Sequence, residues 1–142
     1  VLGNRYTTYE AQAEARTAGN AMGLSYGLLN NRAAVAFMKI VWKSKHRLKI
    51  MPVALIHDAI YLIIDDDLET VEFANKHLTK EMEWQDLPEI WHDEVKLGGD
   101  LDLFYPNWSH GITLSRTANQ SEIIDTVDTA MAKYYEKHKK SS

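Results

Sequence analysis

The feature that most constrains the fold is a pair of short apolar runs rich in β-branched residues, Ile50–Ile56 and Ile60–Ile64. Runs of this length and composition are typical of β-strands, and the short connection between them predicts an antiparallel hairpin. The connection is His57-Asp58-Ala59, so an ionisable pair is placed at the hairpin tip. Any fold of this chain must therefore include a small sheet with a charged turn.

Helical sequence surrounds the hairpin. Upstream, Ala-rich sequence predicts a helix over residues 7–18, a turn or kink within 19–23, and a long helix to about Lys43. Downstream, the three Asp residues at 65–67 predict a helix start, and apolar residues at helical spacing continue to about Glu83.

The C-terminal part predicts one more strand and one more helix. The strand is expected from about Glu94 to Leu97, and Asn119 with Glu122 forms a capping-box pattern at a helix start. We expect the apolar stripe of this helix to pack on the chain's own domain. The stripe comprises Ile123, Val127, Ala130, Met131 and Tyr134. The element order favours an α+β fold, with a small antiparallel sheet packed against long helices.

Charge is unevenly distributed along the chain. Residues 1–50 contain eight Lys or Arg and two Glu, for a net charge of +6, whereas residues 51–104 contain three Lys and fourteen Asp or Glu, for −11. This pattern fits a polyanion partner beside a metal site, and equally two differently solvated faces. The absence of cysteine excludes disulfides, thiolate zinc sites and a Cys nucleophile. The apolar runs are too short for a membrane helix, which needs about 20 residues.

Asp58 is the residue at which the sequence points to chemistry. Burying a carboxylate costs several kcal/mol unless it is paired or bound to a cation, so Asp58 needs solvent, a donor or a metal. One interpretation is a polar hairpin turn, and the other is a metal ligand presented on a rigid hairpin. The residues alone leave both open.

The hairpin resembles motif C of family A DNA polymerases, in which a His-Asp pair lies between two strands of the palm. Upstream, Arg16-Thr17-Ala18-Gly19-Asn20-Ala21 is similar to the Arg-x-Ala-x-Asn-Ala segment that leads into the palm helix of that family, and its spacing to His57 agrees. The resemblance covers roughly residues 10–114 and looks closest to phage members. Further segments that carry it are 25–32 (Ser-Tyr-Gly-Leu-Leu-Asn-Asn-Arg), 95–98 (Val-Lys-Leu-Gly) and 104–106 (Phe-Tyr-Pro).

The resemblance implies a part of a DNA-directed DNA polymerase, with the C-terminal palm portion at 1–114 and a helical extension at 115–142. By resemblance, Asp58 is one of two aspartates that bind the two Mg²⁺ ions of nucleotidyl transfer, and His57 lies against the primer terminus. Arg16 and Asn20 would contact primer-template DNA. Candidate phosphate contacts are Lys39, Lys43 and Lys45.

The chain also departs from the family. Ala59 stands where a Glu usually follows the motif C Asp, and Leu24 stands where the family has a template-contacting Gln. No motif A aspartate precedes these segments, and no fingers helix supplies the Lys and Tyr that bind the incoming nucleotide. We therefore expect a chain that is inactive alone. Its partners would be dNTP, primer-template DNA and a second chain or segment carrying motif A and the fingers.

Further expectations concern location, origin and alternative functions. The resemblance implies a cytoplasmic protein, in the host cell if phage-encoded, and Val1 in place of Met suggests processing or excision from a longer chain. One alternative is a palm-like interaction module without catalysis. A metal-dependent nuclease using 65–67 is weaker, because acidic residues favour a helix N-terminus. A second pair, His92-Asp93, lacks a preceding apolar strand and is expected on the surface at a strand start.

Overall fold

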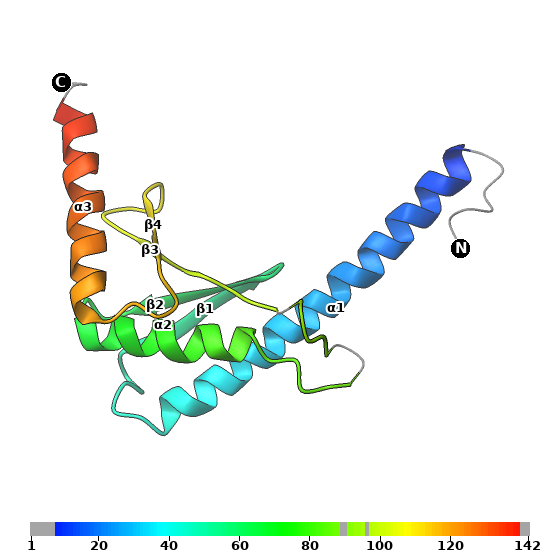
Figure 1. The fold of residues 1–142 in the computed structure, drawn as a ribbon, viewed down its shortest axis with the longest axis horizontal. Coiled ribbons are helices and arrows are strands. Elements are labelled where there is room, and N and C mark those ends of the chain that lie inside the picture. Colours follow the sequence, from blue (N-terminus) through cyan, green and yellow to red (C-terminus); the bar gives the residue numbers. More distant parts are fainter. Residues whose placement is uncertain (1–7, 89–90, 96, 140–142) are drawn as a thin grey trace.

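A computed structural model describes residues 8–88, 91–95 and 97–139. The elements in chain order are α1 (Thr8–Trp42), β1 (Ile50–Ile56), β2 (Ala59–Ile64), α2 (Leu68–Met82), β3 (Leu101–Phe104), β4 (Gly111–Leu114) and α3 (Gln120–Lys139), as Figure 1 shows. Strands β1 and β2 form one antiparallel sheet, and β3 and β4 form another. The predicted α+β class and the first hairpin are confirmed, with two small sheets in place of one.

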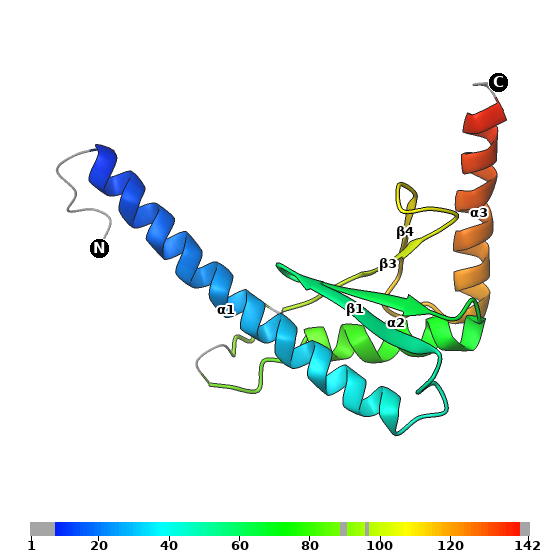
Figure 2. The same ribbon diagram turned by 180° about the vertical axis from the view of Figure 1, so that it is seen from behind.

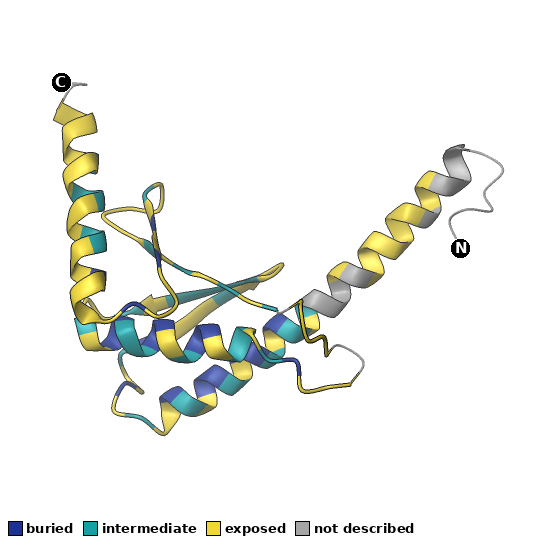
Figure 3. Ribbon diagram, viewed as in Figure 1, coloured by how far each residue is buried: buried dark blue, intermediate teal, exposed yellow. Residues whose placement is uncertain are grey.

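The N-terminal helix is continuous, so the predicted break within 19–23 is wrong. Each glycine inside a helix costs only about 1 kcal/mol relative to alanine, and the surrounding sequence is rich in alanine. The first half of α1 projects away from the body of the molecule (Figures 1 and 2). Its described side chains from Gln12 to Gly23 are exposed (Figure 3). No other described element therefore packs on this part of the helix, and a side chain at Gly19 or Gly23 would meet no neighbour.

The second half of α1 packs with α2 against one face of the β1–β2 hairpin. Phe37 and Val41 of α1 are fully buried and share a cluster with Ile50 of β1 and Ala74 and Leu78 of α2. Alternate residues of β2 complete this cluster from the sheet: Ile60, Leu62 and Ile64. The two helices thus fix the position of the hairpin.

An arginine locks α1 against the C-terminal end of α2. Arg32 Nη1 donates to the carbonyl oxygen of Glu81 at 2.9 Å, and Nη2 pairs with the Glu81 carboxylate at 2.5 Å. The guanidinium carbon also lies 4.0 Å from the ring centroid of Trp84. Hydrogen bonds, charge and stacking together define the crossing of the two helices.

The predicted strand at Glu94–Leu97 is wrong: residues 94, 95 and 97 are not in a strand, and Lys96 lies outside the described residues. The pairing occurs further along, where Leu101–Phe104 pairs with Gly111–Leu114. Ile112 and Leu114 are buried, whereas Gly111 and Thr113 are exposed, which is the alternation of a half-buried strand. Leu114 belongs to the second hydrophobic cluster, together with Val71, Ala118 and Ile123.

Helix α3 begins as the sequence predicts. The Asn119 side chain accepts a hydrogen bond from the Glu122 amide at 3.1 Å, and the Glu122 carboxylate accepts one from the Asn119 amide at 2.9 Å. Ile123 is buried in the second cluster with Val71 and Leu114, and Val127 packs against it. Packing of the stripe on the chain's own domain is confirmed at these two positions. None of the described helices is long and apolar enough to cross a membrane.

Candidate functional site

His57 and Asp58 form the two-residue tip of the β1–β2 hairpin, and both are exposed. His57 has a φ of 54°, and it alone among the described non-glycine residues has a positive φ. A positive φ at the first turn residue but not at the second is typical of a type II′ hairpin turn, where glycine is preferred first. The turn therefore holds a histidine in a conformation that favours glycine.

A buried asparagine holds this tip against α1. The Asn30 side-chain amide lies 3.5 Å from the carbonyl oxygen of His57 and 3.4 Å from that of Ala59, and it donates to both. Asn30 is 2% exposed, and its Oδ1 has no hydrogen-bond partner among the described residues. Sequence reasoning assigned it no role. One signal could have identified it: Asn30 lies one helical turn before the buried Ala33 and Ala34, on the same face of the helix. A buried amide without a hydrogen-bond partner is costly, so Asn30 needs a partner there.

Three of the four predicted site residues meet in one open groove of about 1010 Å³. Asn20 of α1 lines this groove together with His57 and Asp58 of the hairpin tip. The helical wall also includes Gly23 and Gly27, at which an added Cβ would meet nothing within 4 Å. The helix backbone is therefore accessible to a large ligand along this wall.

Arg16 lies outside the groove. It is exposed on α1, four residues before Asn20, and so occupies the same helical face one turn further from the hairpin. Among the described residues, no Lys or Arg lines the groove, whose charged group is Asp58. The Leu24 side chain, which replaces the family's template-contacting Gln, lies outside the described residues.

The described residues do not fit a Mg²⁺ site by themselves. Asp58 also lines a second pocket, which is bounded by β2, β3 and the C-terminal half of α2. Asp100 and Asp102 line this pocket as well. Asp100, however, pairs with Arg116 at 3.0 Å, and Asp102 accepts from the Thr113 hydroxyl at 2.6 Å. No cluster of three or more His, Asp or Glu side chains able to hold a metal occurs in the described ranges. Asp58 offers one hard oxygen ligand and needs others from elsewhere.

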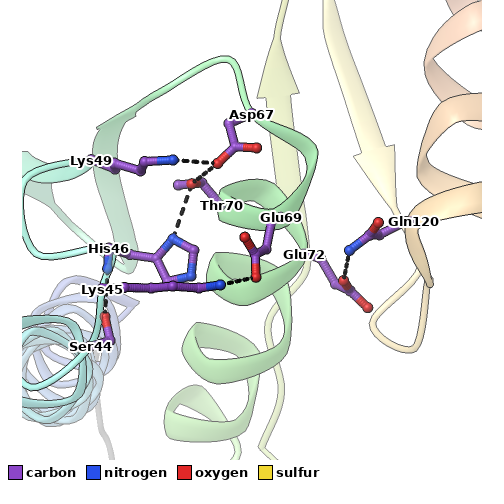
Figure 4. Close-up of polar contacts among 9 residues, drawn as sticks. All are labelled: Ser44, Lys45, His46, Lys49, Asp67, Glu69, Thr70, Glu72 and Gln120. Carbon is purple, nitrogen blue, oxygen red and sulfur yellow. Dashed lines mark hydrogen bonds and ion pairs between the residues drawn. The ribbon is translucent and has the colours of Figure 1, made fainter.

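The basic segment after α1 lies at the end of the hairpin opposite its tip, because it leads directly into β1. There it joins α2, as Figure 4 shows: Lys45 pairs with Glu69, and Lys49 with Asp67 at 2.7 Å. His46 is buried, with its Nδ1 3.1 Å from the Thr70 hydroxyl oxygen. Part of the N-terminal positive charge therefore stabilises the fold. The other candidate phosphate contacts, Lys39 and Lys43, are exposed.

Of the three carboxylates proposed for a nuclease, residues 65–67, Asp67 has a structural role. Asp67 accepts hydrogen bonds from Lys49 and from the Thr70 hydroxyl, and these contacts lower its pKa to about 2. Asp67, the N-cap residue of α2, thus ties the start of this helix to Lys49. His92 and Asp93 are exposed, as expected, but they do not begin a strand.

Comparisons with models of known protein families, with curated proteins and with solved structures found no match to this chain. Function must therefore be inferred from the residues at the hairpin tip and their geometry.

Proposed function

We propose that this chain forms part of a DNA-directed DNA polymerase. It would supply the motif C half of the nucleotidyl-transfer site and contacts to primer-template DNA. The observation that carries the proposal is the tip itself: Asp58 stands on a two-stranded hairpin braced by Asn30, facing the same groove as Asn20. A rigid hairpin is a suitable support for a carboxylate that must meet ligands from another segment.

Each of the chain's own residues has a limited role in this proposal. Asp58 contributes one carboxylate, and His57 beside it lies against the primer end. Asn20 and Arg16, one turn apart on α1, follow the duplex away from that end. Contacts of this kind fix the position of a duplex without reading its sequence. When bound, Mg²⁺ would stabilise the charge that develops during phosphoryl transfer.

A second chain or segment is part of the proposal, because Asp58 does not make a metal site with its described neighbours. That partner would carry the other aspartate and the helix that binds the incoming dNTP. The polymerase activity therefore belongs to the complex.

Primer extension by the reconstituted complex tests the proposal. A labelled primer-template, dNTPs and Mg²⁺ are incubated with this chain, with a polypeptide that carries the second aspartate and the fingers, and with both. We expect extension with both chains only, its loss in Asp58→Asn, and no change in Asp93→Asn. Asp93 is a matched control, since it is also exposed and follows a histidine. Full extension by Asp58→Asn would refute the assignment.

A non-catalytic interaction module is the second candidate, and the outer face of the hairpin favours it. Met51 and Ile63 are direct cross-strand partners, and both are more than 60% exposed. Exposed apolar patches mark interaction surfaces. A natural partner that lacks an aspartate-bearing strand and a Lys/Tyr helix would support this function, particularly if Asp58→Asn leaves the complex intact. A partner with both features would exclude it.

A further inference from the structure

An apolar groove of about 630 Å³ lies between the two hairpins, which are also linked by the stacked rings of Tyr61, Trp108 and Phe104 in its lining. One wall is β2 along its whole length from Ile60, and the other is β3 from Leu101 to Phe104. The floor and flank are apolar side chains of α2 and α3, including Val71, Ile123 and Val127. The groove lies beside Asp58 in sequence, because β2 starts directly after the hairpin tip.

Both walls of this groove are strand edges that no other strand of the described residues pairs with. β2 pairs only with β1, and β3 only with β4, so each has one free edge. The far edge of the first sheet is different: β1 contains Pro52 and a register shift between Pro52 and Ala54. Proline and bulges are devices that protect an edge from strand addition. β2 and β3 contain neither proline nor a register shift.

The direction of the strands suits a single inserted strand. In both views, β2 and β3 run from the side of the hairpin tip towards α3 (Figures 1 and 2). A strand running the opposite way is antiparallel to both neighbours. The lengths of β3 and β2, four and six residues, correspond to an inserted strand roughly 14–20 Å long.

The charge of the groove indicates the charge of the strand that would bind there. Four aspartates contribute to its lining, and no Lys or Arg does so within the described residues. The four are Asp65, Asp66, Asp102 and Asp128. An apolar strand with basic residues at its ends is complementary to an apolar groove with an acidic lining.

We propose that this groove binds an extended, apolar, lysine- or arginine-flanked segment of another polypeptide as a β-strand between β2 and β3, joining the two hairpins into one sheet. Main-chain hydrogen bonds on both sides provide affinity, and the acidic lining selects the flanks. The inference goes beyond the proposed function, since the free edges accept such a strand whether or not Asp58 serves a polymerase.

A synthetic peptide tests the inference with the chain alone. The probe is fluorescein-labelled Lys-Lys-Ile-Val-Val-Thr-Val-Lys-Lys, and its binding is followed by fluorescence anisotropy. Successive amides of an antiparallel strand point to opposite neighbours. N-methylation at odd central positions therefore blocks one edge, and N-methylation at even positions blocks the other. We expect each set to weaken binding roughly tenfold, since both edges contribute.

Two further measurements locate the peptide. Amide hydrogen exchange should slow in both β2 and β3 when it binds. Ile124→Lys, in the lining of the groove, should weaken binding several-fold, while Leu48→Lys should not; both residues are exposed, and Leu48 lies outside the groove. A serine-flanked peptide should bind more weakly at low salt.

Several outcomes would overturn the inference. They are absence of binding, sensitivity to only one N-methylated set, or protection confined to one strand. A dimer seen by analytical ultracentrifugation that excludes the peptide would show that a second copy occupies the groove instead. None of these measurements includes DNA or dNTP, so their failure is distinguishable from failure of primer extension.

Discussion

Replacing His57 by glycine should stabilise the protein. His57 has a φ of 54°, and a positive φ costs a residue with a Cβ roughly 1–2 kcal/mol. The added freedom of glycine in the unfolded chain takes back roughly 0.5–1 kcal/mol. The side chain is exposed, and the brace from Asn30 reaches the backbone carbonyl, which the variant keeps. The free energy of unfolding should therefore rise by about 0.5–1 kcal/mol.

Urea unfolding followed by circular dichroism measures this effect. With a denaturant slope of about 2 kcal/mol per molar, the midpoint should rise by about 0.3–0.5 M. Asp58→Gly is the matched control, because Asp58 occupies the next position of the same turn, is also exposed and lacks a positive φ. It should lower the midpoint by a similar amount, since only the entropic cost applies there. A decrease in His57→Gly equal to that in Asp58→Gly would refute the argument from the turn.

Three further predictions concern the body of the fold. Phe37→Ala should lower the free energy of unfolding by about 3–5 kcal/mol in urea titrations, because Phe37 is fully buried, whereas Leu48→Ala at an exposed site should change little. The pKa of Asp67 is lowered to about 2 by Lys49, so its contribution to stability is present above pH 4 and is lost as the pH falls towards 2. The difference in urea midpoint between the wild type and Asp67→Asn should therefore shrink over that range; a constant difference would contradict it. Asn119→Ala removes half of the capping box and should lower the free energy of unfolding by about 1 kcal/mol. Faster amide hydrogen exchange at the start of α3 would locate the effect.

The first hairpin and the start of α3 were predictable because their signals are local. The β-branched runs around His57 and Asp58 specify strands, and the pair Asn119 and Glu122 specifies a helix start through contacts three residues apart. The second hairpin was missed although Ile112 and Leu114 alternate with exposed residues, since a strand of four residues carries little periodic signal.

The candidate site was predictable only in part. Asn20, His57 and Asp58 line one groove, but the contact that holds the tip comes from Asn30, 27 residues away from His57 in sequence. Sequence patterns over a few neighbouring residues do not reveal a contact between residues so far apart in the chain. The basic segment shows the same limit: Lys45 and Lys49 find carboxylates on α2, which their spacing alone does not reveal.

The glycine-containing part of α1 that lines the groove is a weak stretch of helix. Gly19, Gly23 and Gly27 together cost about 3 kcal/mol of helix propensity relative to alanine, and no packing offsets this where a Cβ would meet only open space. The helix around Asn20 is therefore less stable than the packed second half of α1. Any ligand that uses this wall must order the helix on binding, so its measured affinity will be lower than its contacts imply. Alanine at a glycine whose Cβ stays clear of the ligand should tighten binding.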